Sequence, residues 1–104
     1  MSTFDPERFE DKYEHYFTEL QDVYRRAFDE MSAEYDPDLI HAIDQRILSE
    51  SEPFYEGDGA FRIELPDDVH DRLSDRDPDT VGDVVGAYRA ELRTQLQQVF
   101  GFDP

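Results

Sequence analysis

The sequence of 104 residues contains no cysteine. Disulfides, thiolate nucleophiles and cysteine-based zinc sites are therefore excluded. The sequence also lacks a long apolar run, and no early apolar stretch follows a basic segment as in a secretory leader. Its longest apolar stretches fall far short of the roughly 20 residues that a helix needs to cross a bilayer. We therefore expect a soluble, cytoplasmic protein with no membrane partner.

Basic residues are scarce. Acidic residues number 27 against ten basic ones, nine arginines and Lys12, which gives a formal net charge of -17. Such a surface repels itself in dilute buffer, whereas molar salt shortens the screening length to about 3 Å. The composition therefore favours a halophilic protein. Because no basic patch is present, direct binding to nucleic-acid phosphates is disfavoured.

Helix-breaking residues are missing from one long interval. Between Pro6 and Pro37 the chain has neither proline nor glycine, and apolar residues recur at spacings of three and four. This pattern predicts one long amphipathic helix from Asp5 to Tyr35, with Asp5 as its N-cap. Its apolar stripe comprises Phe9, Tyr13, Tyr16, Phe17, Leu20, Val23, Tyr24, Ala27, Phe28, Met31 and Tyr35.

The length of this helix leads to a prediction about assembly. About 30 residues at about 1.5 Å each form a rod of roughly 45 Å, whereas a compact chain of this size is only about 33 Å across. The remainder of the chain would leave part of the stripe exposed, and exposed apolar patches usually mark interfaces. The sequence therefore predicts a homodimer that buries this stripe.

The rest of the sequence predicts one domain over residues 1–104 with a mainly α (α+β) fold. A short second helix runs from Asp36 to about Glu50, and a helix from Asp79 to Phe100 should pack antiparallel along the first. Asp58 and Gly59 form a strong hairpin-turn signal, and Ala60 to Leu65 alternates like a half-buried strand. The fold class is thus long N-terminal and C-terminal helices with a short helix and a small central β-hairpin.

The loop SESEPFYEGDG (49–59) is the most distinctive local stretch. Our primary interpretation is a non-enzymatic protein that works through protein contacts, with no catalytic, cofactor or metal residues assigned. The residues predicted to contact a protein partner are Glu52, Phe54, Tyr55, Glu56 and Asp58. A last possibility, an acidic decoy for the nucleic-acid site of another protein, is indistinguishable here from halophilic composition.

The alternative is a small enzyme assisted by a divalent metal and built on the acidic loop 50–58. Its ligands would be Glu52, Glu56 and Asp58, because carboxylate oxygens suit a hard cation. His41 or His70 would act as the base. No spacing in this loop matches a defined metal-binding motif.

Two glycines in the last helix permit a second contact. Gly82, Gly86 and Ala90 form a line of small residues at spacings of four. In one interpretation, this line allows another helix to approach closely. In the other, the two glycines are simply exposed, and each weakens the helix by about 1 kcal/mol. Both interpretations stay open.

Three segments carry a resemblance to a known family. They are FDPERFEDKYEHYF (4–17), HAIDQRILSESEPFYEGDGAFRIELP (41–66) and VFGF (99–102). With these segments the chain resembles a small family of haloarchaeal proteins of unknown function over nearly its whole length. The resemblance implies a salt-loving archaeal source and a cytoplasmic setting. It implies no activity and no site residues.

Overall fold

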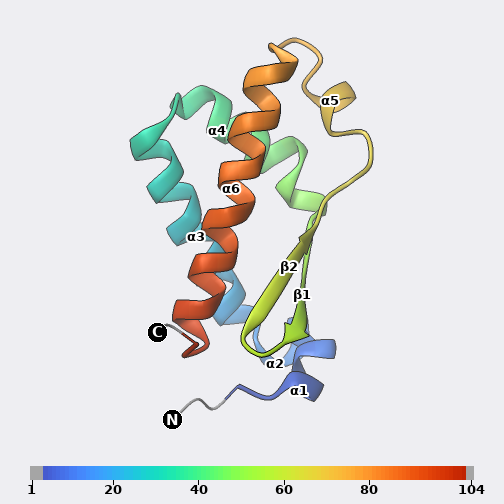
Figure 1. Cartoon of the computed structure of the whole chain (residues 1–104), viewed down its shortest axis with the longest axis vertical. Coiled ribbons are helices and arrows are strands. Elements are labelled where there is room, and N and C mark those ends of the chain that lie inside the picture. The colour runs from blue at the N-terminus through green and yellow to red at the C-terminus, as the bar shows by residue number, and fades with distance from the viewer. Residues whose placement is uncertain (1–3, 103–104) are drawn as a thin grey trace.

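The structure, a computed structural model, describes residues 4–102. Helices α3 and α6 lie side by side and run in opposite directions, and the β-hairpin lies along one flank of α6 (Figure 1). The elements in chain order are α1 (Pro6–Glu10), α2 (Lys12–His15), α3 (Phe17–Glu34), α4 (Pro37–Arg46), the 3₁₀ turn η1 (Leu48–Glu50), β1 (Glu52–Gly57), β2 (Ala60–Glu64), α5 (Val69–Arg72) and α6 (Pro78–Val99). The predicted α+β class, mainly helical with one hairpin, is confirmed.

The core is built on the α3–α6 pair. The inward face of α3 contributes Leu20, Val23, Ala27 and Met31 at helical spacing. Facing them on α6 are Val81, Val84, Val85, Tyr88, Leu92 and Leu96. Ile40 and Ile43 of α4 and Ile63 of β2 are fully buried against this pair. Burial of this apolar area is the main stabilising contribution to the fold.

The predicted single helix from Asp5 to Tyr35 is wrong in its first third. The backbone leaves helical geometry at Asp11, with φ -108° and ψ 44°, and again at Tyr16, with φ -127° and ψ 23°. Only α3 continues unbroken to its end before Tyr35. At about 1.5 Å per residue, its 18 residues span about 27 Å. The rod of roughly 45 Å, on which the homodimer prediction was based, is absent.

Contacts distant in sequence account for the two breaks. The segment 4–16, here called the N-terminal arm, folds back so that the Tyr16 hydroxyl accepts a hydrogen bond from the Asp5 backbone N–H at 3.0 Å. Phe9 and Tyr16 are buried in a cluster of rings with Phe61 and Phe100. A straight helix would carry these rings away from the cluster. Tertiary packing therefore overrides the local helical pattern in the arm.

The hairpin fits the predicted turn closely. Gly57 pairs with Ala60, and the two residues between them, Asp58 and Gly59, have φ of 53° and 77°. Positive φ at both central residues is what a type I′ turn requires. Gly59 also lies close to Phe102, because a Cβ there would be 3.1 Å from the Phe102 ring and would push against it. The turn is thus held against the C-terminal end of the chain.

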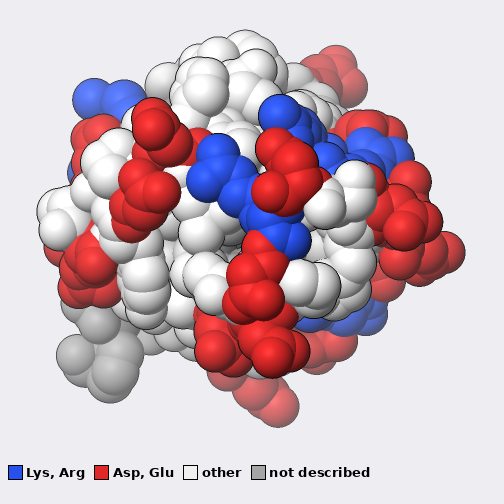
Figure 2. All heavy atoms as spheres, turned by 90° about the horizontal axis from the view of Figure 1, so that it is seen from above, with Lys and Arg blue, Asp and Glu red and all other residues white. Residues whose placement is uncertain are grey.

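Paired charges join α4, η1 and α5 at the opposite end of the molecule. Arg72 binds Asp68 at 2.6 Å and also Glu50, and Arg46 binds Asp75 at 3.1 Å. Figure 2 shows basic side chains lying among acidic ones on this end. Arg46 and Arg72 therefore form ion pairs with acidic residues of the same chain. Across residues 4–102, no helix is long and apolar enough to cross a membrane.

Candidate functional site

Of the five predicted partner-binding residues, three are half-buried (Glu52, Phe54 and Tyr55) and two are exposed (Glu56 and Asp58). Glu52 accepts a hydrogen bond from the Lys12 ammonium at 2.8 Å. Lys12 itself is only 3% exposed, and its nitrogen lies over the rings of Phe9, Tyr13 and Phe54 at 5.3, 5.4 and 4.9 Å from their centroids. Both an acid and π-faces thus stabilise this buried ammonium. The only lysine of the sequence fixes the arm to β1.

Two other members of the predicted site, Tyr55 and Glu56, also have partners within the chain. Tyr55 packs against the rings of Phe61 and Phe102, and its hydroxyl accepts a hydrogen bond from the Gly59 N–H at 3.0 Å. Glu56 pairs with Arg62 at 3.1 Å. Asp58 is exposed in the turn, where its backbone has positive φ. The prediction that these five residues bind a partner is untested.

The metal-assisted alternative requires three ligands that converge. Within residues 4–102, no group of three or more His, Asp or Glu side chains is placed to hold one metal ion. Glu52 and Glu56 are instead paired with basic side chains. His41 on α4 and His70 on α5 are both exposed.

A groove between α3 and the chain leading into β1 is the most distinctive surface feature. Tyr13 and Phe17 are 58% and 52% exposed, more than any other large apolar side chain of the described chain. They stand beside a hollow of about 230 Å³. Its lining, here called the aromatic groove, consists of Tyr13, Phe17, Leu20, Gln21, Tyr24, Leu48, Ser49, Ser51 and Pro53. An apolar hollow beside exposed rings is typical of a contact site.

Hydroxyl groups in this groove form a directed chain. The Ser51 hydroxyl donates to the Leu48 carbonyl at 2.7 Å. Because a hydroxyl carries one proton, the 2.9 Å bond between the Tyr24 and Ser51 hydroxyls has Tyr24 as its donor. Ser49 likewise donates to the Gln45 carbonyl at 2.8 Å. All three hydroxyls therefore have only acceptor capacity left.

The groove has acidic neighbours. Burial raises the pKa of Tyr24 to about 12, and the nearby charges of Glu52 and Asp44 add to this rise. Burial also raises the pKa of Tyr13, again with a contribution from Glu52. Asp44 is itself half-buried, and desolvation raises the pKa of its carboxyl. The two tyrosines are therefore neutral at physiological pH, in a negative local field.

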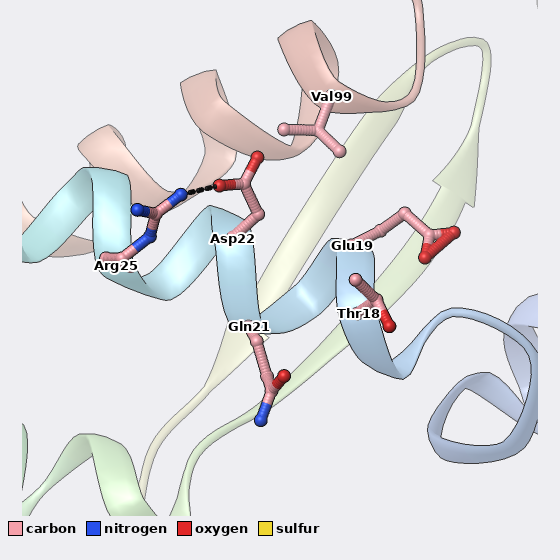
Figure 3. A pocket seen from close by; sticks show the side chains of 6 residues that line it. All are labelled: Thr18, Glu19, Gln21, Asp22, Arg25 and Val99. Carbon is pink, nitrogen blue, oxygen red and sulfur yellow. Dashed lines mark hydrogen bonds and ion pairs between the residues drawn. The ribbon is translucent and has the colours of Figure 1, made fainter.

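A larger hollow lies between α3 and the C-terminal end of α6 but has a different character (Figure 3). It measures about 640 Å³ and is lined by Thr18, Glu19, Gln21, Asp22, Arg25 and Val99. In Figure 3, Asp22 and Arg25 point toward each other while Glu19 and Gln21 point away in different directions. These side chains do not converge on a common point. The hollow is an open surface whose polar groups offer no shared binding point (Figure 3).

Sequence reasoning did not single out Tyr13 and Phe17 as site residues. Both were assigned to the stripe of a long helix, which buries its members against a partner helix. The breaks at Asp11 and Tyr16 instead turn Phe9 and Tyr16 inward and leave Tyr13 and Phe17 exposed. Spacing alone carries no signal of these breaks. The unusual density of rings at 13, 16 and 17 was the available hint.

Comparison with known proteins identifies a family. A model described as a family of unknown function (DUF5783) matches residues 1–103. The chain belongs to the DUF5783 family. No curated protein and no solved structure matches the chain. Because DUF5783 membership brings no assigned activity, the aromatic groove has to be interpreted from its own chemistry.

Proposed function

We propose that this chain is a protein-binding protein whose contact surface is the aromatic groove. The supporting observation is the half-exposure of Tyr13 and Phe17 beside an apolar floor that includes Leu20 and Leu48. Aromatic residues at an exposed surface are favoured anchors of protein interfaces, because they bury a large area with few rotatable bonds. The proposed occupant is a segment of a different protein that inserts one large apolar side chain.

The size of the groove supports a segment over a broad interface. A stable dimer buries about 800 Å² on each partner. Two half-exposed rings beside a hollow of about 230 Å³ offer much less apolar area. Most of the apolar stripe on α3 is already buried against α6. What is left exposed suits a single anchoring side chain.

The homodimer predicted from the sequence is the second candidate. It is favoured by the adjacency of Tyr13 and Phe17, because two copies related by a two-fold axis would stack these rings on each other. Sedimentation equilibrium in molar KCl tests it. A dimer that persists on dilution and is lost in Phe17→Ser would place a second copy at the groove. We expect a monomer, since the apolar area left exposed at the groove is much smaller than the area that a stable dimer buries.

The proposed setting is the cytoplasm of a salt-loving cell. The support is compositional: 27 acidic residues face ten basic ones, and only one of these is lysine. In concentrated salt the repulsion among these acids is screened. Thermal unfolding measured across a KCl series tests this setting. The melting temperature should rise steadily into the molar range, and a maximum near physiological salt would contradict the proposal.

The contact surface is tested by titrating the ¹⁵N-labelled protein in molar KCl with N-acetyl-tryptophanamide, a neutral probe for an anchoring side chain. Amide shifts should change around Tyr13, Phe17, Tyr24 and Leu48. Phe17→Ser should abolish these changes. The control is Tyr35→Ser, which removes a ring that is 39% exposed at the far end of α3 and should leave them intact. Shift changes confined to other regions would overturn the proposal.

A further inference from the structure

We infer that the aromatic groove selects a partner segment that combines an anchor bearing a hydrogen-bond donor with basic flanking residues. This inference rests on the proposed function and names the chemistry of the occupant. It follows from the direction of the hydroxyl chain and from the charges beside the groove.

The hydroxyl chain leaves acceptors and no donors. Tyr24 and Ser51 both line the groove, and each has its single proton engaged, Tyr24 toward Ser51 and Ser51 toward the Leu48 carbonyl. Each oxygen keeps a lone pair that a donor could reach. A buried anchor with an N–H or O–H group gains a hydrogen bond there. A buried anchor with only acceptors leaves them unsatisfied, which is costly.

The charges around the groove also favour a particular kind of partner segment. Among the described residues that line the groove, none is basic. The nearest ammonium, on Lys12, is buried and already paired with Glu52. Since Lys12 offsets the charge of Glu52, the remaining negative field at Tyr24 comes from Asp44. Two donor-bearing side chains, Tyr13 and Gln21, lie on the exposed rim, where they can turn toward water. Positive charge is therefore favoured beside the anchor and negative charge is disfavoured.

These requirements point away from a second copy of the chain. The sequence has no tryptophan, and its ten basic residues are outnumbered by 27 acidic ones. Its surface carries a large excess of acids. A different protein with an indole and nearby arginine or lysine matches the groove on both counts. The indole N–H is a donor without acceptor capacity, and its ring supplies the apolar area.

Three synthetic probes separate the two requirements. The first peptide carries one tryptophan between pairs of arginines, the second replaces that residue by 1-methyltryptophan, and the third replaces the arginines by glutamates. Because the chain contains no tryptophan, indole fluorescence reports binding directly. All titrations are performed at one KCl concentration and repeated at a higher one.

The first peptide should bind roughly five- to tenfold more tightly than the N-methyl peptide, as expected for one hydrogen bond to a buried acceptor. In Tyr24→Phe, which removes one of the two acceptor oxygens, this ratio should fall while both peptides still bind. The arginine peptide should also bind more tightly than the glutamate peptide, by a margin that narrows as KCl rises. Phe17→Ser should weaken the binding of all three peptides.

The outcomes distinguish the inference from the proposed function. If none of the peptides binds at the groove, the proposed function fails. If the indole and N-methyl peptides bind equally well, or the glutamate peptide binds better, the groove is a contact surface but this inference is overturned. The comparison of peptides on the unsubstituted protein needs no variant, so it holds even where Tyr24→Phe disturbs folding.

Discussion

The α3–α6 pair and the N-terminal arm are both rich in apolar residues at helical spacing, yet only the first is regular. In α3, the buried Leu20, Val23 and Ala27 lie on one face of the helix, and the main partner of this helix is α6. In the arm, Lys12 reaches Glu52 on β1 whereas Tyr16 turns to the ring of Phe100. A helix stays continuous when its stripe has one partner. A helix breaks when the residues of its stripe pack against several partners that lie in different directions.

The largest expected effect is in the regular region. Leu92 on α6 is fully buried, and Leu92→Ala should lower the free energy of unfolding by about 2–5 kcal/mol, through lost burial and the cavity left behind. Urea unfolding at constant KCl measures this change. Leu65→Ala is the matched control, because Leu65 is only partly buried, and it should cost less than half as much. Equal losses would mean that the core is not centred on α3 and α6.

A smaller effect, confined to the arm, is expected from its ion pair. Glu52→Ala leaves the Lys12 ammonium buried with rings alone and should cost about 2 kcal/mol. Lys12→Met removes the charge but keeps an apolar chain among the rings, so it should cost about 1 kcal/mol. Amide hydrogen exchange locates the change. Exchange should accelerate in residues 4–16 of Glu52→Ala and stay unchanged in α6.

The order of these two costs is the informative result. If Lys12→Met were more damaging than Glu52→Ala, attraction between the charges would outweigh the cost of burying an unpaired ammonium. Faster exchange throughout α3 and α6 in Glu52→Ala would show that the arm is not a separate unit. The second result would remove the contrast between the two regions.

The smallest expected effect concerns Asp44, beside the aromatic groove. Desolvation raises the pKa of this carboxyl in the folded chain above its unfolded value, so ionised Asp44 lowers stability at neutral pH. The penalty disappears as pH falls below the unfolded pKa of about 3.9. Asp44→Asn should therefore raise the melting temperature slightly at pH 7, with a gain that shrinks toward low pH. Asp83→Asn, at an exposed position on α6, controls for the change in net charge.

Much of the fold was predictable from local chemistry. Asp36 caps α4 and Asp77 caps α6, in each case followed by a proline at the first helical position. The Asp58–Gly59 turn followed from residues that tolerate positive φ. In each case the determining residues are neighbours in sequence, so the pattern alone was enough.

The breaks in the arm were not predictable in this way. Asp11 and Tyr16 are ordinary helix residues, and their non-helical geometry is set by contacts with Asp5 and with β1 and α6. The aromatic groove was not predictable either, because the same breaks leave Tyr13 and Phe17 exposed. The loop residues Phe54 and Tyr55, whose contact with a partner stays a prediction, also contact Lys12 and the ring cluster within the chain. The groove could not be predicted from the sequence, because its shape depends on how the arm folds.

The most direct test of the central claim is hydroxyl-radical footprinting of the chain, purified and within a concentrated high-salt lysate of its own cells. If the aromatic groove is a contact surface in use, Tyr13 and Phe17 should be protected from oxidation in the lysate while Tyr35 reacts equally in both samples. Equal reactivity of Phe17 in the two samples would contradict the account.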